Sequence, residues 1–498
     1  MLNLFSSIKL DKKIDSPLYM QLYTKLKDLI ITGTLLPDSR MPSIRQLAGL
    51  LEVNQITVVS AYRQLENEGY IYTRTGSGTF VSVVLPVREV GNSVLIMSDE
   101  LYQQDDLLLI NNGQITIDDH TINFASATPT PDLFPVEDFK LVLNEVLERD
   151  KGNAFGYQDS QGFYPLRESI CEVLQQNILS CSPENIQIIS GAQQGIDIIS
   201  KMFLKHGDYV ITESPTYTGA IAVFKSRGAE IADIELEEDG PNLNILEYTL
   251  KKYKPKFIYT IPSYQNPTGY SYSNSKRKEI LNLAERYNTF IIEDDYVSDL
   301  DFEGRGYVAL KAEDKNNRVI FIKSFSKIFM PGLRLGFMIA PPNLQGSIIE
   351  AKHTSDISTS GLIQRAFDLY IRKGYWDRHF KFMHNIYKER YLCMIDCLDK
   401  NLPPNITYTK PGGGLNVWLN LPYGYIGGNL FKQAAACNIV FAPGKIFYSG
   451  NTPHKVNNIR LSFAAVHIQQ IEDGIKKLCN IFLSENQKSK NQTSVPIL

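Results

Sequence analysis

The part of the sequence that most restricts the fold is an alternation of strand-like and helix-like stretches that begins after Phe124. Short apolar runs such as IQIISG, DYVITES, KFIYTIP, FIIEDDY and VIFIKSFSK are separated by segments with helical spacing of apolar residues. This order predicts an α/β architecture around a mainly parallel sheet. Each run ends in a polar or charged cluster, and the carboxyl edge of an open α/β sheet is where ligands bind. We therefore expect a ligand site built from these clusters.

One cluster contains Lys327, within SFSKIFMPGLRLGF at residues 324–337. A single lysine is usually a solvated surface charge, but a primary amine placed after a strand can also form a Schiff base with an aldehyde cofactor. Hydroxyls, an arginine fork and the N–H groups of a helix N-terminus nearby predict a phosphate cup. The residues expected in this cup are Ser190, Gly191, Ala192, Gln193, Ser324, Ser326 and Arg334.

Other polar side chains fall where they can hold a pyridine ring. Asp294 lies at a strand end, where a carboxylate can keep a pyridine nitrogen protonated and so maintain an electron sink. Asn266 and Tyr296 can donate hydrogen bonds to a ring phenolate, and Tyr217 can stack on the ring face. Each residue alone also has a structural interpretation, as a turn, a solvated loop or a packing side chain. Their joint order and spacing favour a cofactor site.

The first eighty residues predict a separate unit of three helices and a hairpin. A stripe of leucines and isoleucines at residues 18–30 has helical spacing, and a capping box of Ser43 and Gln46 opens a second helix whose stripe includes Ile44. Asn54 can cap a third helix. The stretch YIYTRTGSGTFV alternates and turns at glycines, which predicts a two-stranded wing.

Two short helices joined by a tight turn and followed by a wing favour DNA binding. Residues 1–81 carry nine Lys and Arg against seven Asp and Glu, whereas the whole chain has a formal charge of −3. Any affinity for DNA should therefore concentrate in this unit and fall with salt. The residues expected to contact phosphates or bases are Ser43, Arg45, Asn54, Gln55, Thr57, Arg63, Arg74 and Ser77.

Residues 82–120 contain one arginine against seven Asp and Glu, which predicts an acidic linker. We expect a DNA-binding domain at 1–81, this linker, and an effector domain at 121–498 with a smaller α+β subdomain at its C-terminal end. The N-terminus lacks a signal-peptide core, and no apolar run approaches a membrane span. The six cysteines are scattered, which favours neither disulfides nor a metal site, so we expect a cytoplasmic protein.

The segment MPSIRQLAGLLEVNQITVVSAYRQLENEGYIYTRTGSGTFV resembles the winged helix-turn-helix of GntR-type bacterial transcription regulators over nearly its whole length. In this segment Asn54 and Gln55 stand where such proteins often have Ser and Arg. The resemblance therefore implies DNA binding, but it does not imply which bases this chain contacts.

From about Phe124 to Phe482, the marks GYQDSQGFYPLR, SGAQQG, ESPTY, NPTG, EDDY, SFSK, PGLRLG and IRLSFA resemble the fold type I pyridoxal-phosphate aminotransferases. This resemblance implies pyridoxal 5'-phosphate as cofactor. It makes Lys327 the internal-aldimine lysine and Asp294 the partner of the pyridine nitrogen. Asn266 and Tyr296 become the partners of the ring phenolate.

A GntR-type head fused to an aminotransferase-like body resembles the MocR subfamily of bacterial regulators. The subfamily implies a transcription regulator that senses pyridoxal phosphate or an amino compound reacting with it, and a head-to-tail, domain-swapped homodimer on operator DNA. Arg460 then resembles the arginine that binds an effector carboxylate. Tyr157 resembles a tyrosine that reaches a phosphate across the dimer interface. In the subfamily's 4-aminobutyrate sensor an arginine lies two residues after the stacking tyrosine. Here Gly219 follows Tyr217 at that spacing, which disfavours 4-aminobutyrate.

Two other functions stay open at this point. The chain can be a working aminotransferase of an α-amino acid with an autoregulatory DNA-binding head, because the lysine, aspartate and arginine for catalysis are all present. Alternatively, the body can be only a dimerisation scaffold. We expect slow half-reactions at most, since a sensor gains by retaining its covalently held cofactor.

Overall fold

The computed structural model describes residues 5, 8, 10, 17–31, 34–35, 39–51, 53–67, 70–74, 78–82, 120–176, 179, 181–422, 427–450 and 457–491. The chain divides into two compact units, Met1–Ser98 and Asp99–Leu498, which we call the head and the body. The predicted linker at 82–120 falls almost entirely outside the described residues. Within the described ranges, no helix is long and apolar enough to cross a membrane.

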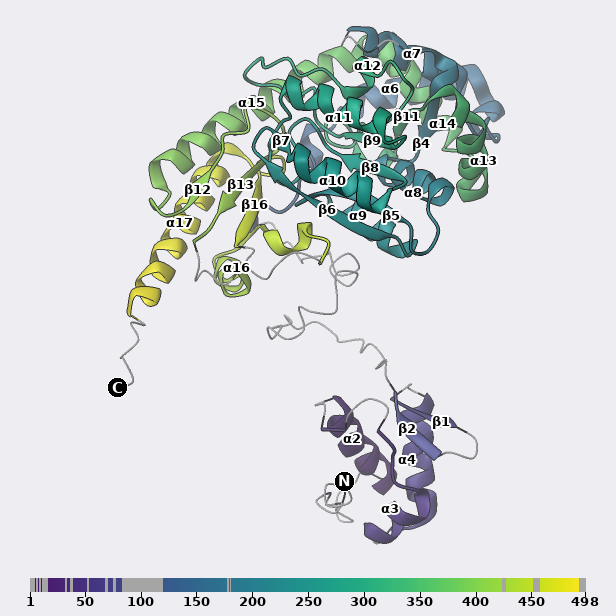
Figure 1. The fold of residues 1–498 in the computed structure, drawn as a ribbon, viewed down its shortest axis with the longest axis vertical. Helices are drawn as coiled ribbons and strands as arrows, with labels where there is room; N and C mark the ends of the chain where they lie inside the picture. Colours follow the sequence, from purple (N-terminus) through teal and green to yellow (C-terminus); the bar gives the residue numbers. More distant parts are fainter. Residues whose placement is uncertain are drawn as a thin grey trace. The chain divides into compact units, whose positions relative to one another are not determined.

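The described part of the head contains three helices followed by a hairpin (Figure 1). These elements are α2 (Leu18–Ile31), α3 (Ile44–Leu50), α4 (Gln55–Asn67), β1 (Ile71–Arg74) and β2 (Gly78–Val81). The capping box before α3 is confirmed, because Gln46 N donates to Ser43 Oγ at 3.3 Å and Ser43 N donates to Gln46 Oε1 at 3.1 Å. Asn54 Oδ1 accepts a hydrogen bond from Ile56 N at 3.0 Å, so it caps α4 as predicted.

One face of each helix forms the core of the head. Its buried apolar residues include Leu22, Leu26, Ile30, Leu47, Ala48, Val58, Ala61, Tyr62 and Leu65. The expectation that Ile44 belongs to this core is wrong, since its side chain is 37% exposed. The short helix α3 buries only Leu47 and Ala48, one turn further on.

The body is built on an eight-stranded sheet with the order β4-β11-β10-β9-β8-β5-β6-β7 (Figure 1). Its strands are β4 (Ile186–Ile189), β5 (Tyr209–Ser214), β6 (Glu230–Glu237), β7 (Gly240–Pro241), β8 (Phe257–Thr260), β9 (Phe290–Asp295), β10 (Val319–Ser324) and β11 (Gly336–Ile339). The run from β10 to β6 is parallel, whereas β11 and β7 are antiparallel to their neighbours. The predicted α/β class with a mainly parallel sheet is therefore confirmed.

Both faces of this sheet are covered. Ile211, Ile258 and Ile291 belong to one hydrophobic cluster, while their sequence neighbours Tyr259 and Ile292 belong to the other. The covering helices are α6 (Val136–Asp150), α7 (Tyr164–Gln176), α8 (Ala192–Phe203), α9 (Thr218–Ser226), α10 (Leu243–Tyr253), α11 (Asn274–Arg286), α12 (Leu310–Glu313), α13 (Gln345–Asp356) and α14 (Gly361–Arg372). Burial on both faces explains why these strands are near-continuous apolar runs in the sequence.

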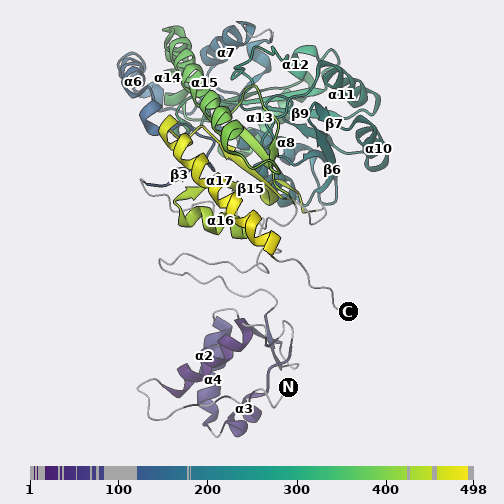
Figure 2. The same cartoon turned by 90° about the vertical axis from the view of Figure 1, so that its left-hand side faces the viewer.

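A smaller antiparallel sheet forms the C-terminal part of the body. It comprises β12 (Thr407–Tyr408), β13 (Asn416–Asn420), β16 (Asn458–Ser462) and β15 (Ala442–Pro443). Helices α15 (Tyr375–Asn401) and α17 (Ile468–Asn491) run side by side next to it, as Figure 1 and Figure 2 show. The body's first strand, β3 (Ile122–Asn123), pairs with β14 (Ile439–Val440), which follows α16 (Gly427–Ala436). The start of the body is thereby joined to this subdomain.

Candidate functional site

The residues predicted around Lys327 gather at the carboxyl edge of the large sheet. Lys327 follows β10 by three residues, and Asp294 lies on β9 opposite Ile322 of β10. Lys327 also interacts electrostatically with Arg334, from the same connection between β10 and β11, and with Arg460, from the smaller sheet. Three segments that are distant in the sequence therefore meet at one point.

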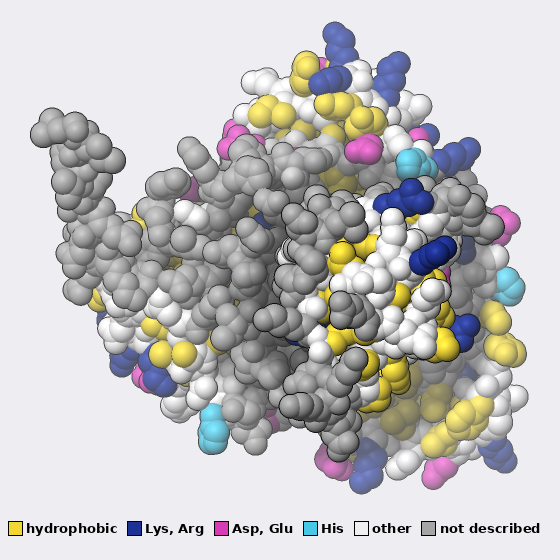
Figure 3. Space-filling model, turned by 90° about the horizontal axis from the view of Figure 1, so that it is seen from below, with side chains coloured by type: hydrophobic (Ala, Val, Ile, Leu, Met, Phe, Trp, Pro, Cys, Tyr) yellow, Lys and Arg dark blue, Asp and Glu magenta, His cyan; other side chains and the backbone are white. Residues whose placement is uncertain are grey.

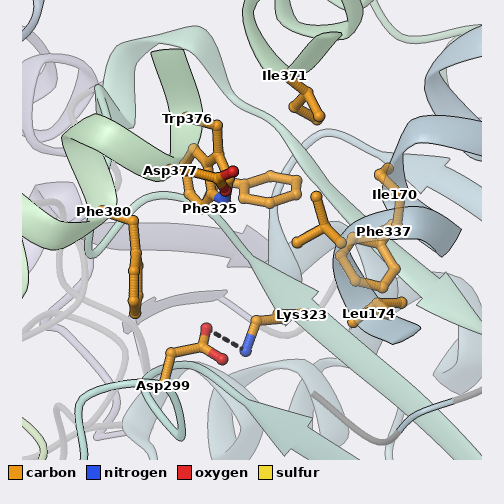
Figure 4. A pocket seen from close by; sticks show the side chains of 11 residues that line it. Ile170, Leu174, Asp299, Lys323, Phe325, Phe337, Ile371, Trp376, Asp377 and Phe380 are labelled. Carbon is orange, nitrogen blue, oxygen red and sulfur yellow. Dashed lines mark ion pairs between the residues drawn. The ribbon is translucent and has the colours of Figure 1, made fainter. Parts of the chain in front are cut away.

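Lys323, a second lysine four residues earlier, has a different role. Its Nζ donates to Asp295 Oδ2 at 2.7 Å and lies 2.8 Å from Asp299 Oδ2. Burial alone would lower the pKa of Lys323, but the two carboxylates more than offset it, so the pKa lies above its usual range. Figure 4 shows Lys323 facing Asp299 in a cavity of about 90 Å³ walled by rings that include Phe325 and Trp376. Lys323 is thus held as a cation and is not a nucleophile.

Lys327 lies in surroundings that favour its uncharged form. Burial, with smaller contributions from the charges of Arg460 and Arg334, lowers the pKa of Lys327 to about 8, and Asp294 opposes them. Among the residues that the structure describes, none forms a hydrogen bond with its Nζ. With this pKa, about a tenth of the amine is uncharged at pH 7, which is the form that attacks a carbonyl carbon.

Asp294 has one satisfied and one unsatisfied oxygen. Tyr259 donates its hydroxyl to Oδ2 at 2.6 Å, whereas Oδ1 is buried and has no partner in the described part of the chain. Burial raises the pKa of Asp294 to about 6, while the bond from Tyr259 lowers it and Asp295 raises it. An unsatisfied buried oxygen costs about 1–3 kcal/mol. A ligand N–H directed at Oδ1 would therefore stabilise the site.

Arg334 and Gly191 form the tightest part of the predicted phosphate cup. Arg334 has a left-handed backbone conformation (φ 51°), and its Nη2 donates to the Ser190 carbonyl at 2.8 Å. Gly191 precedes α8 with φ 90°, and a Cβ there would lie 2.5 Å from that same Nη2. A side chain at 191 would displace the guanidinium. Glycine is therefore required here for two independent reasons.

The remaining cup residues approach the same place with one exception. Ala192 and Gln193 open α8, so their N–H groups lie at a helix N-terminus as predicted. Ser324 donates its Oγ to Ser326 Oγ at 2.9 Å. The hydroxyl of Ser190 is directed elsewhere, because it lies 3.1 Å from Thr359 Oγ1. Ser190 therefore contributes its backbone carbonyl, through Arg334, rather than its hydroxyl.

Tyr217 lies directly before α9 and is fixed by Gln193. Its hydroxyl donates to Gln193 Oε1 at 3.2 Å, and Gln193 Nε2 donates to the Gly219 carbonyl at 2.9 Å. Burial raises the pKa of Tyr217 to about 12, so the hydroxyl stays protonated. A Cβ on Gly219 would lie 2.5 Å from Tyr217 Cζ. Any larger residue at position 219 requires the tyrosine ring to move.

Arg460 is a buried cation at the same site. Its Nη1 donates to Asn266 Oδ1 at 2.9 Å, its Nη2 donates to the Ala125 carbonyl, and its guanidinium lies 5.1 Å from the centre of the Phe447 ring. Burial lowers the pKa of Arg460 to about 10, so it remains charged at neutral pH. Among the described residues, its Nε has no hydrogen-bond partner and no carboxylate forms an ion pair with it. Buried charges are normally paired, which makes Arg460 a candidate position for binding an anion.

Tyr296 and Tyr157, two further predicted residues, differ from the others in their contacts. Tyr296 donates its hydroxyl to the Tyr264 carbonyl at 2.7 Å and accepts a hydrogen bond from Asn416 Nδ2 at 3.0 Å. Its hydroxyl is therefore already engaged within the chain. Tyr157 is 86% exposed and contacts none of the groups described above.

The sequence patterns did not predict the residues that hold the site residues in position through hydrogen bonds. Besides Tyr259, the buried Glu213 accepts hydrogen bonds from Thr260 Oγ1 at 2.7 Å and Gln265 Nε2 at 2.8 Å, and so joins β5 to the loop that carries Asn266. The available signal was weak: an acid and a tyrosine within the otherwise apolar runs DYVITES and KFIYTIP. Asn416, the partner of Tyr296, had no sequence signal.

In the head, most of the predicted DNA contacts are accessible. Arg45, on the first turn of α3, is exposed, as are Gln55 and Arg63 on α4, and Thr57 is half-buried. Ser43 and Asn54 are exposed at the two helix starts. The side chains of Arg74 and Ser77 lie outside the described residues, so their predicted contacts stay predictions.

The body has the fold and the donor set of a pyridoxal-phosphate protein. The unpartnered Oδ1 of Asp294 fits a protonated ring nitrogen, the glycine-lined cradle at Arg334 fits a phosphate, and Lys327 supplies an amine with a lowered pKa. Comparison with known families agrees: the aminotransferase class I and II family matches residues 119–478, and the gntR family of bacterial regulatory proteins matches residues 18–81. The chain belongs to the aminotransferase class I and II family and carries a GntR-type head.

Individual relatives fall into two groups. The aromatic-amino-acid aminotransferase 1 of Thermococcus litoralis is 34% identical over 74% of this chain and 89% of its own length. The crystal structure of an α-aminoadipate aminotransferase of Thermus thermophilus, complexed with N-(5'-phosphopyridoxyl)-L-leucine, has a TM-score of 0.70 at 32% identity and covers 76% of this chain and 97% of that one. The probable rhizopine catabolism regulatory protein MocR of Rhizobium meliloti is 29% identical over 95% of this chain and 96% of its own length.

These coverages distinguish the two groups of relatives. The two aminotransferases leave about a quarter of the chain unmatched, whereas the regulator spans head and body together. The predicted resemblance to the MocR subfamily and the predicted cofactor, pyridoxal phosphate, are confirmed.

Proposed function

We propose that this protein is a transcription regulator in which pyridoxal phosphate, held at Lys327, sets the affinity of the GntR-type head for operator DNA. The observation that carries the proposal is a single chain that combines a winged-helix head with a cofactor site whose amine has a lowered pKa and whose carboxylate has one buried oxygen without a partner among the described residues. Such a chain can couple ligand chemistry in the body to DNA affinity in the head, if the cofactor favours one of two conformations.

Pyridoxal phosphate, when bound, supplies an aldehyde that condenses with primary amines and a protonated pyridine ring that withdraws electrons. Lys327 Nζ would be the primary amine that holds the cofactor. Asp294 Oδ1 would accept the ring N–H, and Tyr217 and Asn266 would contact the ring. The N–H groups at the start of α8 together with Ser324, Ser326 and Arg334 hold the phosphate.

The proposed effector is pyridoxal phosphate itself or an α-amino acid. Arg460 is the expected carboxylate partner, because it is a buried guanidinium with an unpartnered Nε next to Asn266. An arginine in place of Gly219 would displace Tyr217, so this chain lacks that route to a 4-aminobutyrate carboxylate. An effector that carries both an amine and an α-carboxylate fits these residues best.

The proposed assembly is a head-to-tail, domain-swapped homodimer. Tyr157 supports it, because an 86% exposed tyrosine in a segment that resembles the aminotransferases is available to a second copy of the chain. In such a dimer Tyr157 would reach the phosphate held by the other protomer. Sedimentation of the loaded protein tests the assembly, and a monomer at micromolar concentration would contradict it.

Aminotransferase activity is the second candidate function, because Lys327, Asp294 and Arg460 all lie at one site. Single-turnover spectra with a panel of amino acids separate the two candidates. Rapid conversion of the cofactor followed by repeated keto-acid turnover would favour the enzyme, whereas a slow half-reaction without turnover favours the regulator.

Footprinting on the upstream region of the protein's own gene, with and without pyridoxal phosphate, tests the regulatory function. We expect a protected site whose occupancy changes with the cofactor. Absence of specific protection under both conditions would refute the proposal.

A further inference from the structure

The recognition helix α4 exposes an apolar side chain where a solvent-facing helix normally has a polar one. Ile56, on its first turn, is 70% exposed, more than any other large hydrophobic residue described in the head. Val59, three residues later and so on the same side of the helix, is 38% exposed. The core of the head does not use these side chains, because α4 packs inward through other residues such as Val58, Ala61 and Leu65.

The surroundings of this apolar pair indicate what covers it. Arg63 lies seven residues after Ile56, on the same exposed side of α4, and Arg45 is exposed on the first turn of α3. Figure 3, which colours the surface by side-chain type, shows hydrophobic side chains beside lysine and arginine side chains in the view from below. Cations around a small apolar surface fit a polyanion that presents apolar groups. DNA does so in its major groove, where the C5-methyl group of thymine is the apolar feature.

Neighbouring side chains agree with this choice. Gln55, directly before Ile56, is exposed, and an amide is the side chain that pairs bidentately with adenine. Asn54 Oδ1 is already committed to the Ile56 backbone N–H at 3.0 Å, which fixes the first turn. Neither residue is an arginine, the usual reader of guanine, so the start of α4 favours A·T pairs over G·C pairs.

We infer that Ile56, extended by Val59, packs on thymine C5-methyl groups in the major groove, and that these contacts select A·T base pairs in each operator half-site. The inference rests on the proposed DNA-binding function. The apolar contact carries sequence specificity, while Arg45 and Arg63 bind phosphates and carry affinity without specificity.

The test begins with operators selected from random duplexes by the full-length, cofactor-loaded protein. Each thymine of a selected half-site is then replaced by uracil, which removes the methyl group and keeps the base pairing. We expect at least one replacement to weaken binding by wild-type protein about fourfold, the value of one buried methyl. The same replacement should have no effect on Ile56→Ala, and a neighbouring thymine should behave likewise with Val59→Ala.

Control variants separate this contact from other causes. Ile44→Ala removes another exposed apolar side chain of the head and should keep the full response to uracil. Arg63→Ala should weaken binding to thymine and uracil duplexes equally and reduce the salt slope by about one. A thermal melt of each variant shows that the head remains folded.

Each outcome decides a different claim. If no sequence is selected, the proposed DNA-binding function fails. Selected operators without a uracil effect in the wild type, or with the same effect in Ile56→Ala and Val59→Ala, would overturn the inference while DNA binding stands. A change of oligomeric state in Ile56→Ala with an unchanged uracil effect would assign the apolar face to a protein interface and would also overturn it.

Discussion

Tyr259 donates a 2.6 Å hydrogen bond to one carboxylate oxygen of Asp294, and the other oxygen is buried without a partner among the described residues. The bond fixes the carboxylate at the end of β9, on the strand next to the one that leads to Lys327. The two oxygens therefore have different roles. The hydrogen bond from Tyr259 holds one oxygen in place, and the other oxygen can accept a hydrogen bond from the ring nitrogen of the cofactor.

The buried Asp294 predicts a pH-dependent stability of the cofactor-free protein. Burial raises its pKa to about 6 from an ordinary value near 4, so the folded state resists ionisation. Stability from this group is present below pH 4 and is lost as the pH rises to 6 and above. The free energy of unfolding of the wild type, relative to Asp294→Asn, should fall by about 2 kcal/mol between pH 4 and 7.

Urea unfolding of both cofactor-free proteins across this range measures the difference. Pyridoxal phosphate should restore stability to the wild type, because its protonated nitrogen pairs with the ionised carboxylate. Parallel pH profiles for the two proteins would show that Asp294 is not desolvated as described.

The two lysines near the end of β10 predict opposite phenotypes. Lys327→Ala should abolish the visible absorbance of covalently bound cofactor at little cost in stability, because Nζ has no partner among the described residues. Lys323→Gln should retain the absorbance and lose about 3–5 kcal/mol of stability, because Asp295 and Asp299 would lose their buried cation. Absorbance spectra and urea unfolding check both, and exchanged phenotypes would mean that the nucleophile is Lys323.

Gly191→Ala should weaken phosphate binding. A Cβ would lie 2.5 Å from Arg334 Nη2 at a backbone φ of 90°, so the guanidinium must leave its position. Losing one charged hydrogen bond corresponds to about a ten- to hundredfold loss of affinity for pyridoxal phosphate. Pyridoxal without its phosphate should bind both proteins equally. Gly332→Ala, where a Cβ meets no atom within 4 Å, is the matched control.

Arg460→Gln should separate effector binding from cofactor binding. Removing the charge of this buried guanidinium should raise the pKa of Lys327, because Arg460 lowers it, while Lys327 and Asp294 remain in place to hold the cofactor. The spectral response to α-amino acids should fall at least tenfold in apparent affinity. Titrations followed by absorbance measure this, and an unchanged response would mean that the effector carboxylate binds elsewhere. The wild type should not respond to 4-aminobutyrate at concentrations that saturate with an effective α-amino acid.

Local sequence patterns predicted the described helices and hairpin of the head and five strands of the large sheet, because local residue patterns specify these elements. The capping box of Ser43 and Gln46 needs only two residues three apart, and the runs that became β8 and β9 are buried on both faces in a parallel sheet. The exposed Ile44 shows what helical spacing alone does not predict. Helical spacing identifies a stripe, but the packing of a two-turn helix decides which turn is buried.

The pairwise geometry of the site was beyond sequence reasoning. Asn266 and Arg460 are 194 residues apart and meet at 2.9 Å only because the smaller sheet lies over the edge of the larger one. The turn of the Ser190 hydroxyl toward Thr359 depends in the same way on the segment that links α13 to α14. Contacts of this kind follow from tertiary packing, and no local pattern encodes them.

The most direct test of the central claim compares operator affinity with and without pyridoxal phosphate for the wild type and Lys327→Ala. We expect the cofactor to change the affinity of the wild type about five- to 150-fold, the usual range of coupling between two sites. Lys327→Ala should bind the operator with one affinity under both conditions. Equal affinities for the loaded and cofactor-free wild type, or an undiminished cofactor effect in Lys327→Ala, would contradict the account.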